Sequence, residues 1–301
     1  MTMDLTPGAV QARSGGGAAE SGGAPAVVEI AGVGKTFGSG STAVTALESI
    51  DLTIRQGEFV SLIGPSGCGK STLLRLIGDL TSPTSGIVRV NGKPAARARQ
   101  DRDYGMVFQA PVLMDWRTIA KNIELPLEIM GYAADERRRR AADLLRLVEL
   151  ESFADRHPWE LSGGMQQRVA IARALSFDPK LLLMDEPFGA LDEMTRERMN
   201  AELMSIWQRT GTTIVFVTHS IPEAVFLSSR VVVMSARPGR ISQLVEIDLP
   251  AQRTVETRES TRYYELVTRV REALRQHDAP DAGDEGAGPV AAERIRAEGL
   301  A

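Results

Sequence analysis

Hydrophobic positions in the first third of the chain alternate with polar ones. Ile50, Leu52 and Ile54 are separated by polar residues, a pattern typical of a strand with one buried face. Residues 87–90 are largely apolar and are followed by an Asn-Gly pair, which favours a tight turn between antiparallel strands. These patterns predict a small antiparallel sheet near the N-terminus.

Three other segments are apolar at nearly every position. They are residues 59–63, 181–184 and 213–217, and such runs are typical of strands buried on both faces of a parallel sheet. Stretches with helical periodicity separate them. This alternation predicts an α/β fold with a mixed, mostly parallel sheet flanked by helices.

Two of the helical stretches are clearly amphipathic. Within residues 136–150, one face carries Ala141, Leu144, Leu145 and Val148, and the other carries residues 137–140, which are all arginine. We interpret the arginines as a solvated face, with a contact to phosphate or lipid as the alternative. A second stripe predicts a C-terminal helix that packs against the domain, and it consists of Leu266, Val267, Val270, Ala273 and Leu274.

The two ends of the chain have a different composition. Residues 1–25 are mainly Gly, Ala and Ser, so they cannot offset the entropy of ordering and are predicted to be a disordered leader. Residues 278–301 are predicted to be a similar tail, with a weak helix at residues 290–300 as an alternative. A globular domain at residues 26–250 and a helical extension at residues 251–277 remain.

Residues 64–71 match the phosphate-binding pattern G-x-x-x-x-G-K-[ST]. Because the match follows a buried strand and precedes an apolar helical stretch, an accidental glycine-rich turn is a poor alternative. Glycines let backbone N–H groups turn toward one anion, and the helix N-terminus adds partial positive charge. Lys70 is then placed to reach the terminal phosphates, and Ser71 is placed to hold Mg²⁺.

An Asp-Glu pair ends the second apolar run. Asp185 is placed to reach the metal through water, and Glu186 is placed to accept a proton from an attacking water. Such a pair is a weak signal alone, but combined with the phosphate loop it indicates nucleotide hydrolysis.

Charge and cysteine content narrow the class of protein further. With 35 Lys and Arg against 39 Asp and Glu, no basic field is available for counterion release, so nucleic acid is not expected as a partner. One cysteine excludes an internal disulfide. No apolar run approaches the roughly 20 residues of a membrane span, and the start of the chain lacks the layout of a secretory signal. We therefore expect a soluble, cytoplasmic chain that acts on a membrane only through a partner.

The order of three motifs resembles one family. Leu-Ser-Gly-Gly-Met-Gln-Gln-Arg at residues 161–168 lies between the phosphate loop and the Asp-Glu pair, as in the ATP-binding cassette (ABC) ATPases. The resemblance covers residues 26–250. It implies a P-loop NTPase core with an N-terminal antiparallel β-subdomain and an inserted α-helical subdomain at about residues 112–160.

The resemblance also implies roles for residues outside these motifs. Phe37 would stack on adenine, Gln109 would form the glutamine loop, Asp192 the D-loop, and His219 would be the switch histidine that senses the γ-phosphate. Each residue type alone is more often a surface or core residue, so the assignment depends on the order of the motifs. The implied catalytic residues are Lys70, Gln109, Glu186 and His219, and the implied Mg²⁺ ligands are Ser71, Gln109 and Asp185. The implied ATP contacts are Phe37, Gly64, Pro65, Ser66, Gly67, Cys68, Gly69, Lys70, Ser71, Thr72, Gln109, Ser162, Gly163, Gly164, Asp192 and His219.

One chain carries one copy of each motif. The resemblance implies that two cassettes pack head to tail, so that residues 162–164 of one cover the ATP bound to Lys70 of the other. A second copy of this chain is the simplest partner.

The segment after Gln109 resembles a particular branch of the family. Residues 115–118, Asp-Trp-Arg-Thr, resemble the same segment in importers of nitrate, sulfonates, taurine or pyrimidine-type precursors. This resemblance implies integral membrane transporter subunits as partners, a substrate-binding protein as an indirect one, and a peripheral location on the cytoplasmic face of the cell membrane. Trp116 and Met114 are expected to contact the membrane subunit, with a place in the local core as the alternative.

Two other classes were weighed against the transporter. An ABC-type ATPase that acts on nucleic acid or ribosomes would usually carry a coiled-coil insertion, zinc-ligand cysteines or two cassettes in one chain, and a nucleotide sensor would lack Glu186 or His219. Cys68 allows a separate hypothesis, because Lys70 and backbone donors would favour its thiolate. The alternative is a small residue that fits the loop.

Overall fold

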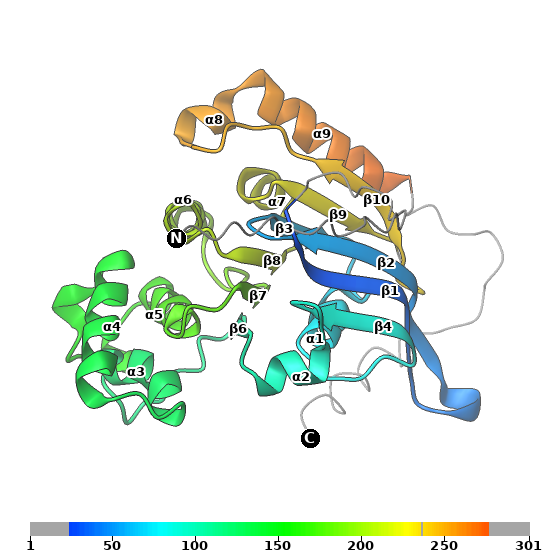
Figure 1. Cartoon of the computed structure of the whole chain (residues 1–301). Helices are drawn as coiled ribbons and strands as arrows, with labels where there is room; N and C mark the ends of the chain where they lie inside the picture. The colour runs from blue at the N-terminus through cyan, green and yellow to red at the C-terminus, as the bar shows by residue number, and fades with distance from the viewer. Residues whose placement is uncertain (1–23, 236, 277–301) are drawn as a thin grey trace, which may run out of the picture.

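The computed structural model describes residues 24–235 and 237–276. Its central sheet has six strands in the order β10-β9-β3-β8-β7-β6, and all pair in parallel except β10, which is antiparallel to β9 (Figure 1). The three strands predicted as buried runs are confirmed, because nearly every residue in them is buried. The strands are β3 (Phe59–Ile63), β6 (Tyr104–Val107), β7 (Leu181–Asp185), β8 (Thr213–Val217), β9 (Arg230–Met234) and β10 (Ile241–Glu246).

The predicted N-terminal antiparallel sheet is also confirmed. It has the order β2-β1-β4-β5, and Ile50, Leu52 and Ile54 are buried on β2, as is Leu47. Asn91 and Gly92 both have positive φ, as the tight turn between β4 and β5 requires. The strands are β1 (Ala26–Phe37), β2 (Val44–Arg55), β4 (Ser85–Val90) and β5 (Lys93–Pro94), with a short 3₁₀ helix η1 (Gly40–Thr42) between β1 and β2.

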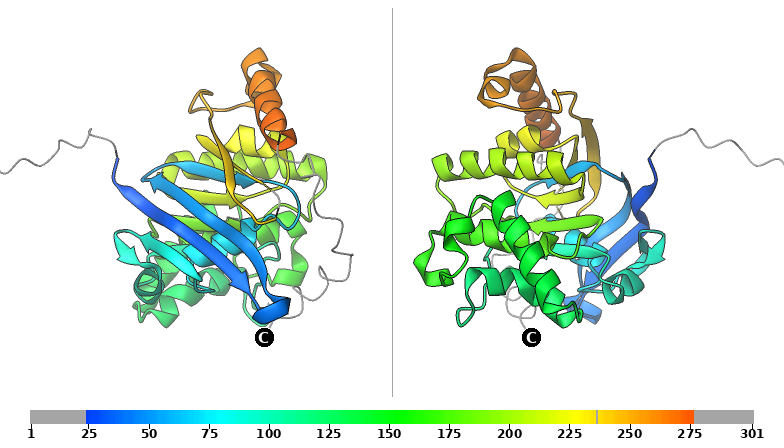
Figure 2. Two further views of the ribbon diagram at one scale, coloured as in Figure 1. Left: turned by 90° about the vertical axis from the view of Figure 1, so that its right-hand side faces the viewer. Right: turned by 60° about the vertical axis from the view of Figure 1, so that its left-hand side comes forward.

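Helices cover both faces of the central sheet. Figure 2 shows the antiparallel strands on one side of the molecule and the α3 to α5 helices on the other. The helices are α1 (Lys70–Ile77), α2 (Ala95–Gln100), α3 (Ile119–Ile129), α4 (Ala134–Leu147), α5 (Gly163–Leu175), α6 (Glu193–Thr210), α7 (Ile221–Leu227), α8 (Val255–Glu259) and α9 (Thr261–Arg275), with 3₁₀ turns η2 (Glu151–Phe153) and η3 (Pro158–Glu160). No helix within the described residues is long and apolar enough to cross a membrane.

Two hydrophobic clusters lie on opposite faces of the central sheet. On β3, Phe59 and Ile63 belong to the cluster that includes residues of α3 to α7 and α9, while Val60 and Leu62 belong to the one that includes α1 and the N-terminal sheet. Successive side chains of a strand point to opposite faces, so a strand with apolar residues on both faces contributes to both clusters. Each such side chain stabilises the fold by about 1.5–3 kcal/mol.

The arginine run on α4 differs from the prediction. Arg138 is largely exposed, as expected, but Arg137 and Arg140 are partly buried. Arg140 pairs with Asp178 at 2.8 Å, and Arg137 lies 3.7 Å from the buried carboxylate of Glu124. The prediction of a wholly solvated face is therefore wrong, since two of the four arginines pack α4 against its neighbours.

The predicted C-terminal helix, α9, packs against the domain. Leu266, Val267, Val270 and Ala273 are buried in the cluster shared with α7 and β9, and the hydroxyl of Tyr263 donates to the carbonyl of Pro222 at 2.9 Å. The predicted leader at residues 1–25 falls almost wholly outside the described residues, and so does the predicted tail with its alternative helix at residues 290–300.

Candidate active site

Four loops meet at the carboxyl edge of the parallel strands. The register pairs Asp185 at the end of β7 with Val217 at the end of β8, and Val217 also pairs with Leu62 on β3. The loops that follow these strands and β6 carry the phosphate loop, Asp185 and Glu186, His219, and Gln109. Ligands of open α/β sheets bind at this edge.

The phosphate loop takes a conformation that only glycine permits at two positions. Gly67 and Gly69 have φ of +77° and +93°. A Cβ on Gly69 would lie 2.5 Å from a methyl carbon of Leu47, so a side chain there would be both strained and crowded. This loop contains eight of the predicted ATP contacts in sequence, together with Lys70: Gly64, Pro65, Ser66, Gly67, Cys68, Gly69, Ser71 and Thr72.

Lys70 lies inside this loop. Its Nζ donates hydrogen bonds to the carbonyl oxygens of Gly64 at 2.8 Å and Pro65 at 3.0 Å, and the residue is only 7% exposed. The loop therefore holds a desolvated ammonium group at the N-terminus of α1, where an anion is favoured electrostatically.

Ser71 and Asp185 form an oxygen pair suited to a divalent cation. The Ser71 hydroxyl donates to Oδ1 of Asp185 at 2.7 Å. Burial raises the pKa of the Asp185 carboxyl, although the Ser71 hydrogen bond and the charge of Arg75 oppose the shift. A hydroxyl and a carboxylate are hard oxygen ligands of the kind Mg²⁺ uses, and a bound cation would keep Asp185 ionised. The residues present therefore fit Mg²⁺.

Glu186 and His219 contact each other beside this pair. Oε2 of Glu186 lies 3.5 Å from Nδ1 of His219, and both side chains are partly exposed. Glu186 has φ of +46°, an unusual conformation for a residue with a side chain, and its N–H donates to the carbonyl of Val217 at 3.1 Å. The strained backbone aims the carboxylate at the edge of the sheet, where it can accept a proton from water.

Gln109 is exposed and lies next to the loop that follows Glu186. A Cβ built on Gly189 would lie 3.3 Å from Nε2 of Gln109 and 3.5 Å from Oε2 of Glu186. The amide of Gln109 and the carboxylate of Glu186 therefore flank the same glycine.

The predicted signature loop and D-loop lie beside each other. Ser162 caps α5 by accepting from the N–H of Met165 at 3.4 Å, and Asp192 caps α6 by accepting from the N–H of Thr195 at 2.9 Å. A Cβ on Gly164 would lie 3.2 Å from the methyl group of Thr195, while Gly163 is more open. Hydrogen bonds from Thr195 lower the pKa of Asp192.

These two loops are separate from the phosphate loop within one chain. Among the described residues, no hydrogen bond or ion pair joins Ser162, Gly163, Gly164 or Asp192 to residues 64–72. Figure 1 shows the same separation, with α5 beside α3 and α4 and with α1 below the central sheet. One chain therefore does not bring all the predicted ATP contacts together.

Phe37 ends β1 and is half-buried. Nζ of Lys35 lies 4.7 Å from the centroid of its ring, a cation–π contact. Nothing in this geometry assigns a nucleotide base to the ring, so its predicted role with adenine stays a prediction.

The structure does not support a reactive Cys68. Its side chain is only 1% exposed, and burial raises the pKa of the thiol despite the nearby charge of Lys70. The thiolate hypothesis is therefore wrong. Cys68 instead packs as a small apolar residue beneath the loop, close to Gly64 and Met234.

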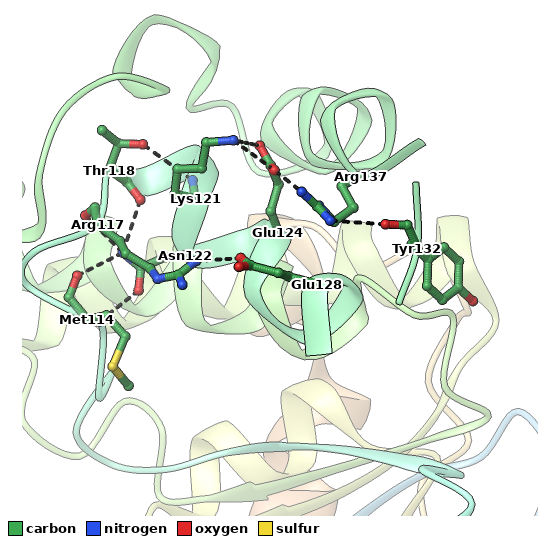
Figure 3. A network of polar contacts seen from close by, with 9 residues as sticks. All are labelled: Met114, Arg117, Thr118, Lys121, Asn122, Glu124, Glu128, Tyr132 and Arg137. Atoms are coloured by element: carbon green, nitrogen blue, oxygen red, sulfur yellow. Dashed lines mark hydrogen bonds and ion pairs between the residues drawn. The ribbon is translucent and has the colours of Figure 1, made fainter. Parts of the chain in front are cut away.

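Asn122 is a structural residue of this region that the sequence analysis missed. It is fully buried on α3, and its carboxamide accepts from the N–H of Met114 at 2.7 Å and donates to the carbonyls of Met114, Arg117 and Thr118 at 3.0–3.1 Å (Figure 3). It thereby fixes the loop that carries Trp116. The sign of this role in the sequence is a lone asparagine within an apolar helical stretch.

Ion pairs hold the helices around this loop. Glu124 is almost fully buried and pairs with Lys121 at 2.9 Å, while Arg117 pairs with Glu128 at 2.7 Å (Figure 3). On the other side of the loop, Arg173 of α5 donates to the carbonyls of Pro111 and Val112. The segment between Gln109 and α3 is thus anchored at both ends.

The fold and this site define a P-loop nucleotide hydrolase. A sequence profile described as ABC transporter matches residues 47–189. An uncharacterized ABC transporter ATP-binding protein of Methanocaldococcus jannaschii is 51% identical over 222 residues, which cover 73% of this chain and 82% of that protein. The chain belongs to the ABC transporter family, and it is an ATP-binding cassette ATPase.

Named relatives come from transport systems. The nitrate import ATP-binding protein NrtD of Synechocystis sp. is 48% identical over 223 residues, covering 74% of this chain and 83% of that protein. The taurine import ATP-binding protein TauB of Burkholderia pseudomallei is 47% identical over 209 residues, covering 69% and 80%. Among solved structures, a dimeric ATP-binding cassette in a post-hydrolysis state, bound to ADP and Pi, is 38% identical, with a TM-score of 0.63 over 73% of this chain and 98% of that one.

Proposed function

We propose that this ATPase drives a membrane importer for small compounds of the nitrate, sulfonate and taurine type. The observation that carries the proposal is Trp116, which is 76% exposed on a loop held rigidly beside Gln109. An exposed tryptophan on a fixed loop is typical of a protein interface. The names of the relatives NrtD and TauB support import and the substrate class.

The membrane subunit would dock on an apolar surface around Trp116. Ile129 at the end of α3 is 66% exposed, and Val112 is 52% exposed. A cavity of about 310 Å³ lies between β6 and the end of α3, and it is lined in part by Tyr104, Met106, Pro126, Ile129, Met130 and Phe177. This surface adjoins the segment that follows Gln109. Movement of Gln109 at the catalytic edge of the sheet would therefore be transmitted to a docked partner. The chain would then sit peripherally on the cytoplasmic face, with the substrate-binding protein as an indirect partner.

The positions of the side chains support the catalytic roles that we propose. Lys70 would bind the β- and γ-phosphates of ATP once these replace its present carbonyl partners. Ser71 and Asp185 would hold Mg²⁺, with Gln109 as a further oxygen ligand, and the ion would neutralise phosphate charge. Glu186 would take the proton of the attacking water, and His219 would contact the γ-phosphate.

We propose that two copies form the working unit. The separation of residues 162–164 from the phosphate loop within one chain is the reason, because a second copy packed head to tail supplies the missing side of the site. The cassette of known structure was solved as a dimer. ATP would be bound between Lys70 of one copy and Ser162 of the other, so binding closes the dimer and hydrolysis opens it.

Co-expression with the proteins of neighbouring genes tests the transport role. The tagged chain should co-purify with a multi-spanning membrane protein, and the complex in liposomes should take up labelled nitrate, taurine or an alkanesulfonate only with ATP. A complex with Lys70→Ala is the matched control. Recovery of nucleic acid or ribosomes in place of a membrane protein would contradict the proposal and support the rival class of ABC ATPase.

A further inference from the structure

Glu223 is a buried carboxyl group that the catalytic roles above do not use. It lies in α7, is 5% exposed, and accepts a short hydrogen bond from the hydroxyl of Thr218. The same hydroxyl accepts from the N–H of Ser220 at 3.0 Å. Because Thr218 and Ser220 stand on either side of His219, the Glu223 carboxyl holds the backbone that carries the histidine.

The other oxygen of Glu223 faces α6. Oε1 of Glu223 and Oδ1 of Asn200 are both buried without a hydrogen-bond partner, and the Asn200 side chain adjoins the Glu223 carboxyl. Two acceptors left unsatisfied inside a protein are destabilising, unless a hydrogen bond joins the two groups. Burial raises the pKa of Glu223, while the Thr218 hydrogen bond, the charge of Arg196 and a hydrogen bond from Asn200 oppose the shift. A hydrogen bond between the Glu223 carboxyl and the Asn200 side chain would satisfy both groups.

The helix that Glu223 reaches starts at the D-loop. Asp192 caps α6, and one turn later Nη2 of Arg196 donates to the carbonyl of Leu191 at 2.8 Å. Asn200, one turn further along α6, is 2% exposed, and α6 packs against α7. Helix α6 therefore connects the D-loop to Asn200, whose side chain adjoins the carboxyl of Glu223.

We propose that Glu223 is a positioning residue that links the His219 segment to α6 through hydrogen bonds rather than through charge. In a dimer, the D-loop would lie at the contact with the second copy. The position of the D-loop would then affect how closely His219 approaches the γ-phosphate. The inference rests on the proposed roles of His219 and Asp192.

Substitutions of Glu223 and of its partner Thr218 distinguish the positioning role from a role in stability alone. Glu223→Gln keeps an acceptor for Thr218 and supplies an N–H for Asn200, so it should retain most of the turnover. Glu223→Leu and the milder Thr218→Val should lower kcat about tenfold with ATP affinity unchanged. Tyr263→Phe, which removes a hydrogen bond to α7 at Pro222, is the matched control and should keep the wild-type kcat.

A double-mutant cycle tests the contact with α6. Asn200→Leu should lower kcat as Glu223→Leu does, and combining the two should cost little more than either alone. Wild-type kcat in folded Thr218→Val overturns the inference, and so does a Glu223→Gln variant as slow as Glu223→Leu, since charge would then be the link. His219→Ala separates the two proposals: wild-type turnover there refutes the role of His219 itself, whatever the Glu223 variants do.

Discussion

The carboxylate of Glu186 and the imidazole of His219 lie 3.5 Å apart at the ends of neighbouring strands. Their strands are in register, with Asp185 opposite Val217, and the N–H of Glu186 bonds to the carbonyl of Val217. The proposed proton acceptor and the proposed γ-phosphate contact are therefore fixed to the same two strand ends. A shift of one of these strands would displace both groups.

Glu186→Gln should keep ATP binding and slow hydrolysis by about 10² to 10⁴-fold. The amide preserves the shape of the side chain but cannot accept the proton of the attacking water. ATP should then remain bound and hold two copies together, which light scattering would detect as a stable dimer. Hydrolysis at the wild-type rate by the purified variant would refute the role of Glu186.

Lys70→Ala should abolish binding of ATP, because it removes the only ammonium group enclosed by the phosphate loop among the residues that the structure describes. Titration calorimetry measures the loss, and turnover should fall with affinity. Lys180→Ala is the control, since Lys180 precedes β7 at the opposite edge of the sheet. Equal ATP affinity in folded Lys70→Ala and wild type would show that Lys70 does not contribute to nucleotide binding.

Asp185→Asn should stabilise the free protein while abolishing Mg²⁺-dependent hydrolysis. Burial raises the pKa of Asp185 in the folded state above its unfolded value, so the ionised carboxylate opposes folding at every pH above the folded pKa. Asparagine keeps an acceptor for Ser71 without the charge. The expected gain is about 0.5–2 kcal/mol near neutral pH, measured by chemical denaturation without nucleotide.

The gain should disappear as the pH falls through the pKa of Asp185, because wild type then becomes neutral too. A variant that is less stable than wild type at pH 7 would show that the Asp185 charge is compensated in the fold. Mg²⁺-dependent turnover that survives in the variant would contradict its assignment as a metal contact.

Cys68 should resist modification in the native protein. The thiol is buried and burial raises its pKa, so at pH 7 neither access nor thiolate is available. Maleimide should label the chain within minutes in guanidinium chloride and far more slowly without it. Fast labelling of native protein, unchanged by Mg-ATP, would place Cys68 outside the phosphate loop.

Trp116→Ala should weaken assembly with the membrane subunit and leave the isolated ATPase stable. A side chain that is 76% exposed contributes little to the core, so the change in unfolding free energy should stay within about 0.5 kcal/mol. Loss of binding free energy should reach about 2 kcal/mol or more. Tyr264→Ala, a substitution of another exposed aromatic residue on α9, is the control. A large drop in melting temperature for Trp116→Ala would favour the local-core alternative instead.

Motifs with a fixed local geometry could be predicted from sequence. Residues 59–63 and 181–184 form buried strands because their apolar side chains are stable only when both faces of the strand are covered. The glycines before Lys70 are a separate local signal, and they permit the tight turns of a phosphate-binding loop. The meeting of Ser71 with Asp185, 114 residues apart, follows from the parallel order of those strands. The apolar runs predicted a parallel sheet, but they did not predict the order of its strands.

Contacts that depend on helix packing could not be predicted. Glu223 and Asn200 have no sequence spacing that relates them, because α6 and α7 are joined through β8 and their facing sides are set by the core. Arg140 was assigned to solvent because its partner Asp178 lies 38 residues away, in the turn after α5. The burial of Cys68 could not be predicted for a related reason: its sequence neighbours are polar, but its side chain points into the core below them.

If the membrane subunit docks around Trp116 as proposed, the carboxamide of Asn122 would also affect how fast it associates. The four hydrogen bonds of Asn122 hold residues 114–118 in one conformation in the free protein. Association then loses little conformational entropy in this segment and needs no folding step. Asn122→Ala leaves Trp116 unchanged but should slow its association with the membrane subunit. Without the hydrogen bonds of Asn122, only a fraction of molecules would hold the indole in the bound orientation at any moment.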